Sequence, residues 1–596
     1  MTVGFLLLNA ALIAVLLLAP TVVGPGGDAA PQVTRSLLTR WLPFAFALST
    51  ALAIVLARGA LDPQRILRRH FWGYLAVPAT FALVTFGDHV ATGVLGAPYV
   101  ALVAFMAWCG LAGLWRSREL RSDRALGRLL GLIALAAMLA LLPYERTVQR
   151  TESDEPHYLI IMQSLVRDHD LDLKNEYDDA DYADFYAPAL PDRHVIVSGS
   201  SELPIRDLGL PLLGAIPFAI ARRTGVLVLM CLMTAAFAWR GYRLLRALTV
   251  SRDASFLAVA AVAFLHPLFT YSTQIYPDVP AALVVLLVAE LLARPPTAAR
   301  LAAASALLGT MPWLTVRGWL PVVGIGAVVA YQALRPLARG ITRDRLTLVV
   351  AAAVPFAALI LALAFLDYRL FGIPIPNAGY ILIRDAQPVL VYSPQVGIPG
   401  VFLDRSFGLL SRAPVFALMF FGAVPVWRLA RATRSPALVA LFLGWLCYLV
   451  YIGDIAYWWA DGSPSSRYQL ATIAFPMVAV AAGIERLRGD VPRLMVLAAV
   501  WWTVAVTAVF ALYPNLRYDI STEVVRGDPG KLWVFVSRAL RVDPGLLFPS
   551  LVRGATSDVV LVFGWTVFLA GLVVLGARRP AAAALTVPAV APTVTM

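Results

Sequence analysis

Two adjacent acids, Asp154 and Glu155, directly follow an apolar stretch and precede Pro156. Proline fits the first turn of a helix, so we expect a helix to begin here. Apolar residues follow at positions that would let this helix lie on a bilayer, namely Leu159, Ile160, Met162, Leu165 and Val166. A carboxylate at the head of such a helix can take a proton from the hydroxyl of an acceptor. A structural interpretation competes, because Asp154 is also a good N-cap residue.

The loop that contains this pair is rich in acids. Residues 144–207 hold fifteen of the chain's 36 Asp and Glu residues, against six Lys or Arg. One part of the loop, DLDLKNEYDDADYADFY (170–186), mixes Asp with Tyr and Phe, a composition that suits a sugar or a divalent cation. A solvated acidic face explains the same run, and its spacing matches no specific metal motif.

Three further segments place polar groups beside aromatic residues. Asp278 lies in YPDVP (276–280), Arg317 ends PWLTVR (312–317), and Arg467 lies in YWWADGSPSSRY (457–468). An arginine on the outer side of a membrane needs a partner, which can be an acid, a lipid headgroup or a phosphate. Trp459 and its neighbours fit either an interfacial aromatic belt or a surface for sugar stacking.

The elements that position these residues are transmembrane helices. The 596 residues are 60% hydrophobic and 14% charged, with a mean hydropathy of +0.76, which is more apolar surface than a soluble fold can bury. We predict an all-α polytopic membrane protein with about sixteen spans, since sixteen windows are long enough to cross a hydrocarbon core of about 30 Å. The windows lie near 3–23, 37–57, 71–87, 92–115, 126–143, 224–243, 254–271, 279–294, 297–313, 318–334, 346–366, 411–430, 436–452, 466–485, 493–512 and 556–577.

Arginines between the spans predict the topology. They cluster in alternate connections, at 58–69, 116–124, 240–252 and 335–345, which the positive-inside rule places in the cytoplasm. The net charge of +13 is therefore a topology signal, and we expect no nucleic-acid partner. The scheme requires that the apolar segment 208–222 does not cross, so residues 144–223 form one extracytoplasmic loop. Residues 580–596 are expected to be a flexible cytoplasmic tail.

Several motifs together resemble the GT-C superfamily of membrane glycosyltransferases, which use polyprenyl-phosphate sugars. An acidic pair after a span matches Asp154 and Glu155. The other motifs are GLPLL (209–213), YPDVPAAL (276–283), PNAGY (376–380), LDRSFGLL (403–410), APVF (413–416) and SPSSRY (463–468). The resemblance covers about residues 126–512, which leaves 1–125 as an added module of four helices and 513–579 as an outer loop with the last span. GT-C members often carry a His before the GLPLL-like run, where this chain has Pro204-Ile205-Arg206-Asp207.

The resemblance implies a sugar transfer from a polyprenyl-phosphate donor to a glycan, lipid or protein outside a bacterial cytoplasmic membrane, by inverting single displacement. Asp154 would be the general base, and phosphate binding would fall to Arg467, Arg405 and Arg317. Residues expected to bind acceptor or sugar are Glu155, His157, Tyr158, Asp278 and Trp459. Glu155 would orient the helix or hold His157. Dependence on Mg²⁺ or Mn²⁺ stays open, and a secondary transporter or lipid flippase is the alternative function.

Overall fold

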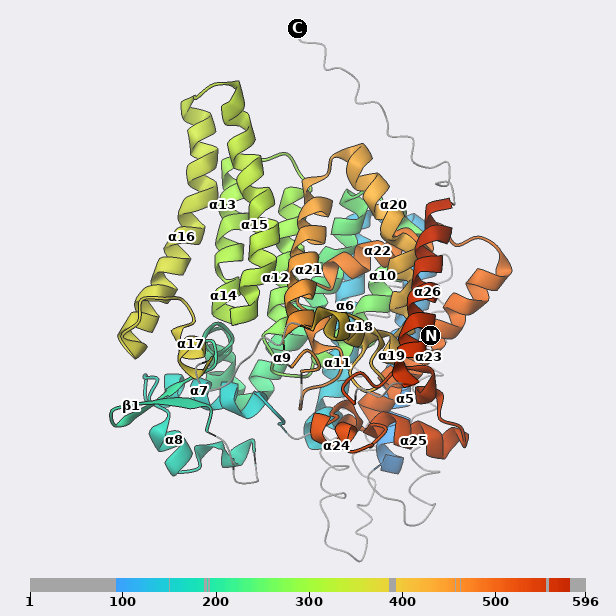
Figure 1. Ribbon diagram of the computed structural model, residues 1–596, viewed down its shortest axis with the longest axis horizontal. Helices are drawn as coiled ribbons and strands as arrows, with labels where there is room; N and C mark the ends of the chain where they lie inside the picture. The colour runs from blue at the N-terminus through green and yellow to red at the C-terminus, as the bar shows by residue number, and fades with distance from the viewer. Residues whose placement is uncertain are drawn as a thin grey trace, which may run out of the picture.

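The computed structural model describes residues 93–148, 151–186, 190, 193–384, 393–455, 457–460, 462–553 and 557–578. The predicted spans at 3–23, 37–57 and 71–87 and the expected tail 580–596 lie outside these residues. Within them, helices form nearly all of the regular structure, and the single sheet is a two-stranded hairpin (Figure 1). The chain is an all-α polytopic membrane protein, as its composition predicts.

Eight helices of the described residues are long and apolar enough to cross a membrane. They are α6 (Asp123–Val148), α9 (Gly209–Ala247), α15 (Trp319–Leu334) with its flanking turns, α16 (Arg343–Phe371), α20 (Leu418–Thr433), α21 (Pro436–Asp454), α23 (Asp490–Leu512) and α26 (Ser557–Arg578).

Five more helices occupy the other predicted windows of the described chain. They are α5 (Gly93–Arg116), α10 (Arg252–Ala263), α12 (Asp278–Leu292), α13 (Ala298–Gly309) and α22 (Ala474–Ile484). Four of them have 15 residues or fewer, so the number of spans stays a prediction. Helices α10 and α13 end before the predicted windows 254–271 and 297–313 do. A proline lies shortly after each end, Pro267 and Pro312 respectively, and proline disfavours the continuation of a regular helix.

Helix α9 consists of two arms joined by a sharp turn. Ala221 and Arg222 have non-helical backbone angles. A side-chain carbon added at Gly225 would lie 1.9 Å from the carbonyl oxygen of Pro217, so the second arm folds closely back on the first and only glycine fits. The first arm exposes apolar side chains, including Ile216 and Ile220. The turn separates 208–222 from the second arm, and the expectation that 208–222 does not cross the membrane stays a prediction.

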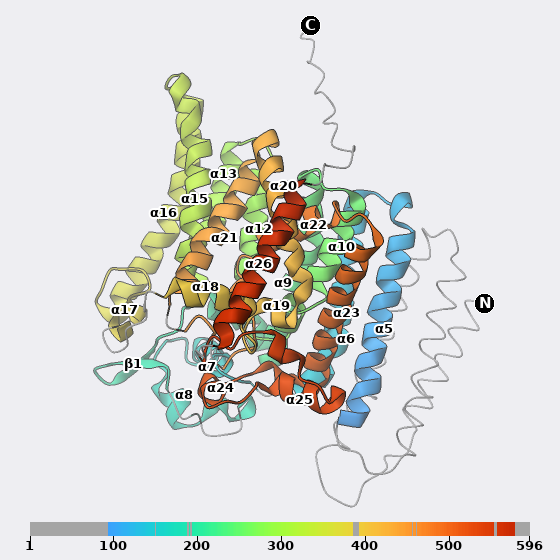
Figure 2. The same cartoon turned by 45° about the vertical axis from the view of Figure 1, so that its right-hand side comes forward.

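The arginine-rich connections gather at one end of the molecule. Arg118 pairs with Asp253, and both Arg246 and Arg252 pair with Asp123, which joins the turn between α5 and α6 to the turn between α9 and α10. The turn between α15 and α16 lies at the same end in both views (Figures 1 and 2). This shared end fits the alternation that the charge pattern predicts.

Short elements gather at the opposite end (Figure 1). They are α7 (Glu155–Arg167), α8 (Lys174–Asp178), strands β1 (Val195–Ser198) and β2 (Ser201–Pro204), α17 (Ala378–Arg384), α24 (Ser521–Val525) and α25 (Lys531–Leu540). The strands pair antiparallel from Val195 opposite Pro204 to Ser198 opposite Ser201. The sequence analysis did not predict this hairpin.

Helix α7 packs inside the protein, which corrects one expectation. We expected its apolar residues to lie on the bilayer, but every residue from 155 to 164 is buried. Leu159 and Met162 are fully buried in the main core, beside residues of α6 and α9. Ile160 belongs to a second cluster with Leu173 and Tyr177 of the outer loop. The head of α7 is therefore fixed by protein on its sides, so Asp154 has a defined position.

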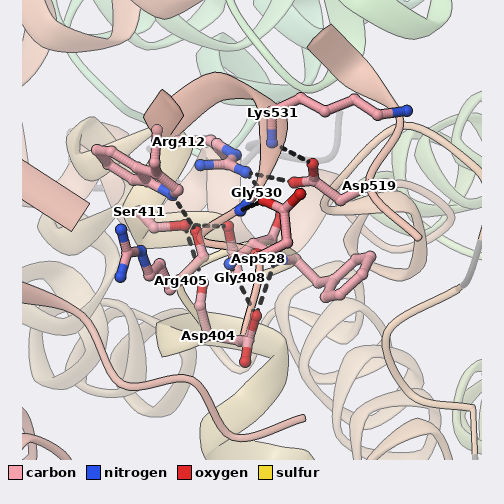
Figure 3. Close-up of polar contacts among 12 residues, drawn as sticks. Asp404, Arg405, Gly408, Ser411, Arg412, Asp519, Asp528, Gly530 and Lys531 are labelled. Carbon is pink, nitrogen blue, oxygen red and sulfur yellow. Dashed lines mark hydrogen bonds and ion pairs between the residues drawn. The ribbon is translucent and has the colours of Figure 1, made fainter. Parts of the chain in front are cut away.

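The segment after α23 is joined to the core by buried ion pairs. Arg517 pairs with Glu145 at the end of α6, at 2.5 Å. Arg412, in the short helix α19 (Leu409–Arg412), donates to Asp519 at 2.9 Å, and the Lys531 backbone N–H donates to the same carboxylate at 2.7 Å (Figure 3). The described part of the segment that we predicted as a loop before the last span, residues 513–553, is thus folded onto the end opposite the arginine-rich turns.

Candidate active site

The carboxylate of Asp154 lies between two guanidinium groups. Its Oδ1 accepts from Arg206 Nη2 at 2.5 Å, and its Oδ2 accepts from Arg467 Nη1 at 2.9 Å. Asp154 occupies the N-cap position of α7 but makes no capping hydrogen bond, so the structural interpretation of this residue is not met. Burial alone would raise the pKa of Asp154, but Arg206 and Arg467 hold it well below its usual range. The side chain is ionised at neutral pH.

Arg467 is held from several sides. Its Nε donates to Asp278 at 3.1 Å, and its guanidinium carbon lies 4.3 Å from the ring centre of Tyr276. The segment that carries it is also fixed, since the Ser466 backbone N–H donates to the carbonyl of Phe407 at 3.1 Å. The motifs YPDVPAAL, LDRSFGLL and SPSSRY, which are far apart in the sequence, therefore meet here.

Arg206 follows the β-hairpin and contacts a histidine at the start of the same hairpin. The Ile205 backbone N–H donates to the carbonyl of His194 at 3.1 Å, which closes the hairpin. Arg206 Nη2 lies 2.9 Å from His194 Nδ1. The His194 ring stacks on His157 with centroids 3.6 Å apart, and Nδ1 of His157 lies 2.9 Å from the hydroxyl of Tyr177.

Glu155 points away from Asp154. It accepts from the backbone N–H of Ile275 at 2.6 Å and from that of Glu152 at 3.3 Å. Burial raises the pKa of Glu155 to about 7. Its contacts orient the head of α7, as expected. The other expectation, that Glu155 holds His157, is wrong, because His157 contacts Tyr177 and His194 instead.

A third arginine lies beside this network. The guanidinium carbon of Arg317 is 4.7 Å from the ring centre of Tyr468, and that of Arg467 is 6.0 Å from the same ring. Arg317 forms no ion pair among the described residues, and its buried Nε has no hydrogen-bond partner there. Asp207, beside it in space, accepts from the Val316 backbone N–H at 2.8 Å and from the Asn377 side chain at 2.6 Å.

Among the residues that the structure describes, positive charge exceeds negative charge in this site. Asp154 and Asp278 pair with Arg206 and Arg467, and the guanidinium of Arg317 lies beside them. Burial raises the pKa of Asp207 to about 7, so this carboxyl supplies only part of a negative charge at neutral pH. An uncompensated cation in a buried position is costly, and an anionic ligand such as a phosphate removes that cost.

Two other predicted site residues differ in what they contact. Tyr158 is buried next to Asp154, on the first turn of α7. Trp459 makes edge contacts with Tyr457 and Trp458, and its indole N–H has no hydrogen-bond partner in the described chain.

Arg405 is not part of this group. Its guanidinium pairs with Asp543, and its carbonyl accepts from the Trp533 indole at 2.6 Å. It lies in the cluster around Asp404 and Arg412 (Figure 3). Its position therefore gives no support to the predicted role in phosphate binding.

Three acids of the run after α7 form ion pairs at the surface. Asp178 pairs with Lys174 and Arg193, Asp181 with Arg167, and Asp184 with Arg222. Across the described residues, no group of three or more His, Cys, Asp or Glu is arranged to hold a metal ion. Around Asp154 the nearest charged groups in the described chain are guanidiniums, which are not metal ligands, and dependence on Mg²⁺ or Mn²⁺ stays an open prediction.

The sequence analysis missed Arg206 and His194 as site residues. Arg206 had one signal, since it stands just before GLPLL, where the resembled family often has a His. His194 had none, because its role depends on the hairpin that brings it to Arg206.

Comparisons with known proteins found distant structural likeness alone. No family model matches the sequence, and no curated protein matches it. A crystal structure of the Archaeoglobus fulgidus oligosaccharyltransferase, without ligand, is 14% identical, covering 71% of this chain and 60% of that chain at a TM-score of 0.38. ArnT from Cupriavidus metallidurans, bound to undecaprenyl phosphate, is 14% identical, covering 75% and 77% at a TM-score of 0.40.

A third structure is archaeal AglB from Archaeoglobus fulgidus in complex with an inhibitory peptide and a dolichol-phosphate. It is 14% identical, with a TM-score of 0.38, and the match covers 70% of this chain and 60% of that chain. The present chain thus spans 60% of the length of the oligosaccharyltransferase structures.

Proposed function

We propose that this chain is an integral membrane glycosyltransferase of the GT-C type, which moves a sugar from a polyprenyl-phosphate donor to an extracytoplasmic acceptor. The observation that carries the proposal is the site around Asp154: a buried carboxylate held by Arg206 and Arg467, with the guanidinium of Arg317 nearby, which has no ion-pair partner in the described part of the chain. Sugar transfer from a phosphate donor needs a base and cationic groups. The acceptor hydroxyl loses a proton in the reaction, and the leaving phosphate gains negative charge.

The position of the site fits a lipid-carried substrate. Asp154 follows α6, and Arg467 follows α21, two helices long and apolar enough to cross a membrane. The site therefore lies where spans end and the outer segments begin, at the end opposite the arginine-rich turns (Figure 2). A phosphate anchored in the bilayer by a prenyl chain meets a water-soluble acceptor at that depth.

The reaction is a single displacement. The acceptor oxygen attacks the anomeric carbon of the sugar from the face opposite the phosphate, and the bond from that carbon to the phosphate oxygen breaks. Asp154 takes the proton of the acceptor hydroxyl, and the polyprenyl phosphate leaves with the bond's electron pair. Arg467 and Arg317 stabilise the charge that develops on the leaving phosphate. The anomeric configuration is inverted.

The proposal is tested by following the donor lipid. Purified protein in nanodiscs, supplied with polyprenyl-phosphate-linked sugars and with membrane extract as a source of acceptors, should release polyprenyl phosphate, detected by mass spectrometry. Release should be lost in Asp154→Asn. A protein that instead moves the intact sugar lipid between the leaflets of proteoliposomes, without breaking the sugar phosphate bond, would be a flippase, and the proposal would fail.

A further inference from the structure

The proposed base is enclosed by its two partners, and its side chain is 11% exposed. One guanidinium bonds to each oxygen of Asp154, Arg206 to Oδ1 and Arg467 to Oδ2. The same two arginines hold the pKa of Asp154 below its usual range, which makes the carboxylate a weak proton acceptor. Because the carboxylate is so little exposed, an acceptor hydroxyl gains space beside it when one of the two guanidinium groups moves aside.

The two arginines differ in how firmly they are held. Arg467 has a second carboxylate, Asp278, and an aromatic face, Tyr276, and its side chain is 5% exposed. Among the described residues, the other hydrogen-bond partner of Arg206 is a ring nitrogen of His194, and the Arg206 side chain is 20% exposed. A guanidinium with a second carboxylate partner is held more firmly than one whose second partner is an imidazole, so Arg206 is the weaker of the two partners.

Arg206 also lies at a partly open edge of the site. It lines a small pocket of about 20 Å³ between the segment 204–208, α16 and α17. Asp367 and Tyr380 line the same pocket, and Arg467 does not border it. With 20% of its side chain exposed against 5% for Arg467, Arg206 is the less tightly packed of the two arginines.

We propose that Arg206 is a displaceable latch on Asp154: it closes the carboxylate in the absence of donor, and it transfers its hydrogen bond to the donor phosphate, which frees Oδ1 for the acceptor hydroxyl. This inference rests on the proposed function and adds an order of events, because the base becomes available only when a phosphate is bound. The unbalanced positive charge of the site makes the exchange favourable, since the phosphate brings new anionic oxygens to the same guanidinium groups.

The latch predicts a specific coupling between two residues, measured by the binding of polyprenyl phosphate to the full-length protein in nanodiscs. In the wild type, the phosphate has to compete with Asp154 for Arg206. Asp154→Asn removes the competitor, so affinity should rise, by about tenfold if the coupling is in the usual range for contacting residues. Arg206→Gln should lower affinity by about ten- to a hundredfold, the usual cost of a lost charge-assisted contact.

The double variant separates the latch from simple repulsion between the carboxylate and the phosphate. With Arg206→Gln already in place, Asp154→Asn should raise affinity by much less than it does alone. An equal rise in both backgrounds would overturn the latch, because repulsion acts whether or not Arg206 is present. Arg206→Lys in the same cycle keeps a cation and provides the comparison if the glutamine variant folds poorly.

Arg167→Gln is the matched control for these variants. It removes an arginine whose side chain is 54% exposed and which pairs with Asp181 at the surface, so the affinity for polyprenyl phosphate should be unchanged. Should the wild type fail to bind polyprenyl phosphate at all, the proposed function itself fails, and the latch with it. Binding without coupling leaves the function standing and removes the latch alone.

Discussion

Asp154 and Arg467 are 313 positions apart in the chain, yet Oδ2 of the acid accepts from Nη1 of the arginine at 2.9 Å. Both side chains are almost entirely buried, at 11% and 5% exposed. Removing either partner of such a pair leaves an uncompensated buried charge, which is strongly destabilising. Tests of catalysis at this site therefore need substitutions that keep shape and hydrogen bonding, together with a check of folding.

Asp154→Asn should abolish sugar transfer, while Glu155→Gln should retain most of it. Asparagine keeps the size of the side chain and removes the proton acceptor, and loss of a general base typically costs about 10² to 10⁴ in rate. Glutamine at 155 resembles the protonated form of a side chain that bonds to Ile275 and not to the reacting groups. Initial rates of polyprenyl phosphate release measure both. If Glu155→Gln were inactive while Asp154→Asn remained active, Glu155 would be the base.

Arg467→Lys and Arg405→Lys should separate the two arginines that stand in family-like motifs. Arg467 contacts Asp154 and Asp278 through two different nitrogens, so Arg467→Lys should lower transfer about ten- to a hundredfold, since lysine lacks the planar fork that spans the two carboxylates. Arg405 pairs with Asp543 outside this site, so Arg405→Lys should transfer at close to the wild-type rate. Equal losses in the two variants, at equal thermal stability, would contradict this assignment.

The sequence predicted the helices well because each carries its own signal. Apolar length and flanking arginines are local properties, so every predicted window in the described chain contains a helix. Asp154 was found for the same reason, since its position after a span and before Pro156 is visible in a few residues. Arg467 and Asp278 also stood out, as polar groups in short outward segments.

The partners of these residues were not predictable, because they depend on contacts between distant segments. The apolar face of α7 suits a bilayer and a protein core equally, and only packing against α9 and the outer loop decides between them. In the sequence, Arg405 and Arg317 are both arginines in predicted outward segments, and this signal does not tell them apart. In the structure, Arg405 pairs with Asp543, whereas no described acid pairs with Arg317. The Arg206 contact with Asp154 requires a hairpin whose strands, of four residues each, give little signal.

Arg412→Gln should destabilise the protein without belonging to the site. Arg412 and Asp519 are 1% and 3% exposed, and Arg412 also lies over the ring of Trp533, with 5.1 Å to the ring centre. Breaking a buried pair by removing one partner typically costs about 3 to 5 kcal/mol. We expect a clear fall in the temperature of unfolding in detergent, and polyprenyl phosphate affinity close to normal in the fraction that remains folded. A variant of unchanged stability would show that the pair is not what fixes the outer loop.

Glu155 should make thermal stability fall as the pH rises. Burial raises the pKa of Glu155 to about 7 in the folded protein, above its value of about 4.3 in an unfolded chain. The folded state therefore holds this proton more tightly, and stability from this group is full below the unfolded pKa and is lost progressively as the pH rises through 7. Glu155→Gln mimics the protonated form, so its unfolding temperature should fall less between pH 5 and pH 8 than that of the wild type. Parallel curves would place the loss of stability in other groups.

The hairpin turn and the turn between α15 and α16 should be accessible from opposite sides of the membrane. Ser200 is exposed next to Gly199 in the hairpin, and Ile341 is exposed between α15 and α16. Ser200 is the better site for a cysteine, because Gly199 has a φ of 65° that disfavours other residues. In a protein whose own cysteines, Cys109, Cys231 and Cys447, are replaced by alanine, a membrane-impermeant maleimide applied to intact cells should label Ser200→Cys and spare Ile341→Cys until the membrane is opened. Because both turns are tied to rigid elements, the reverse pattern would invert the whole assignment and place Asp154 on the cytoplasmic side, where a lipid-linked donor would no longer be required.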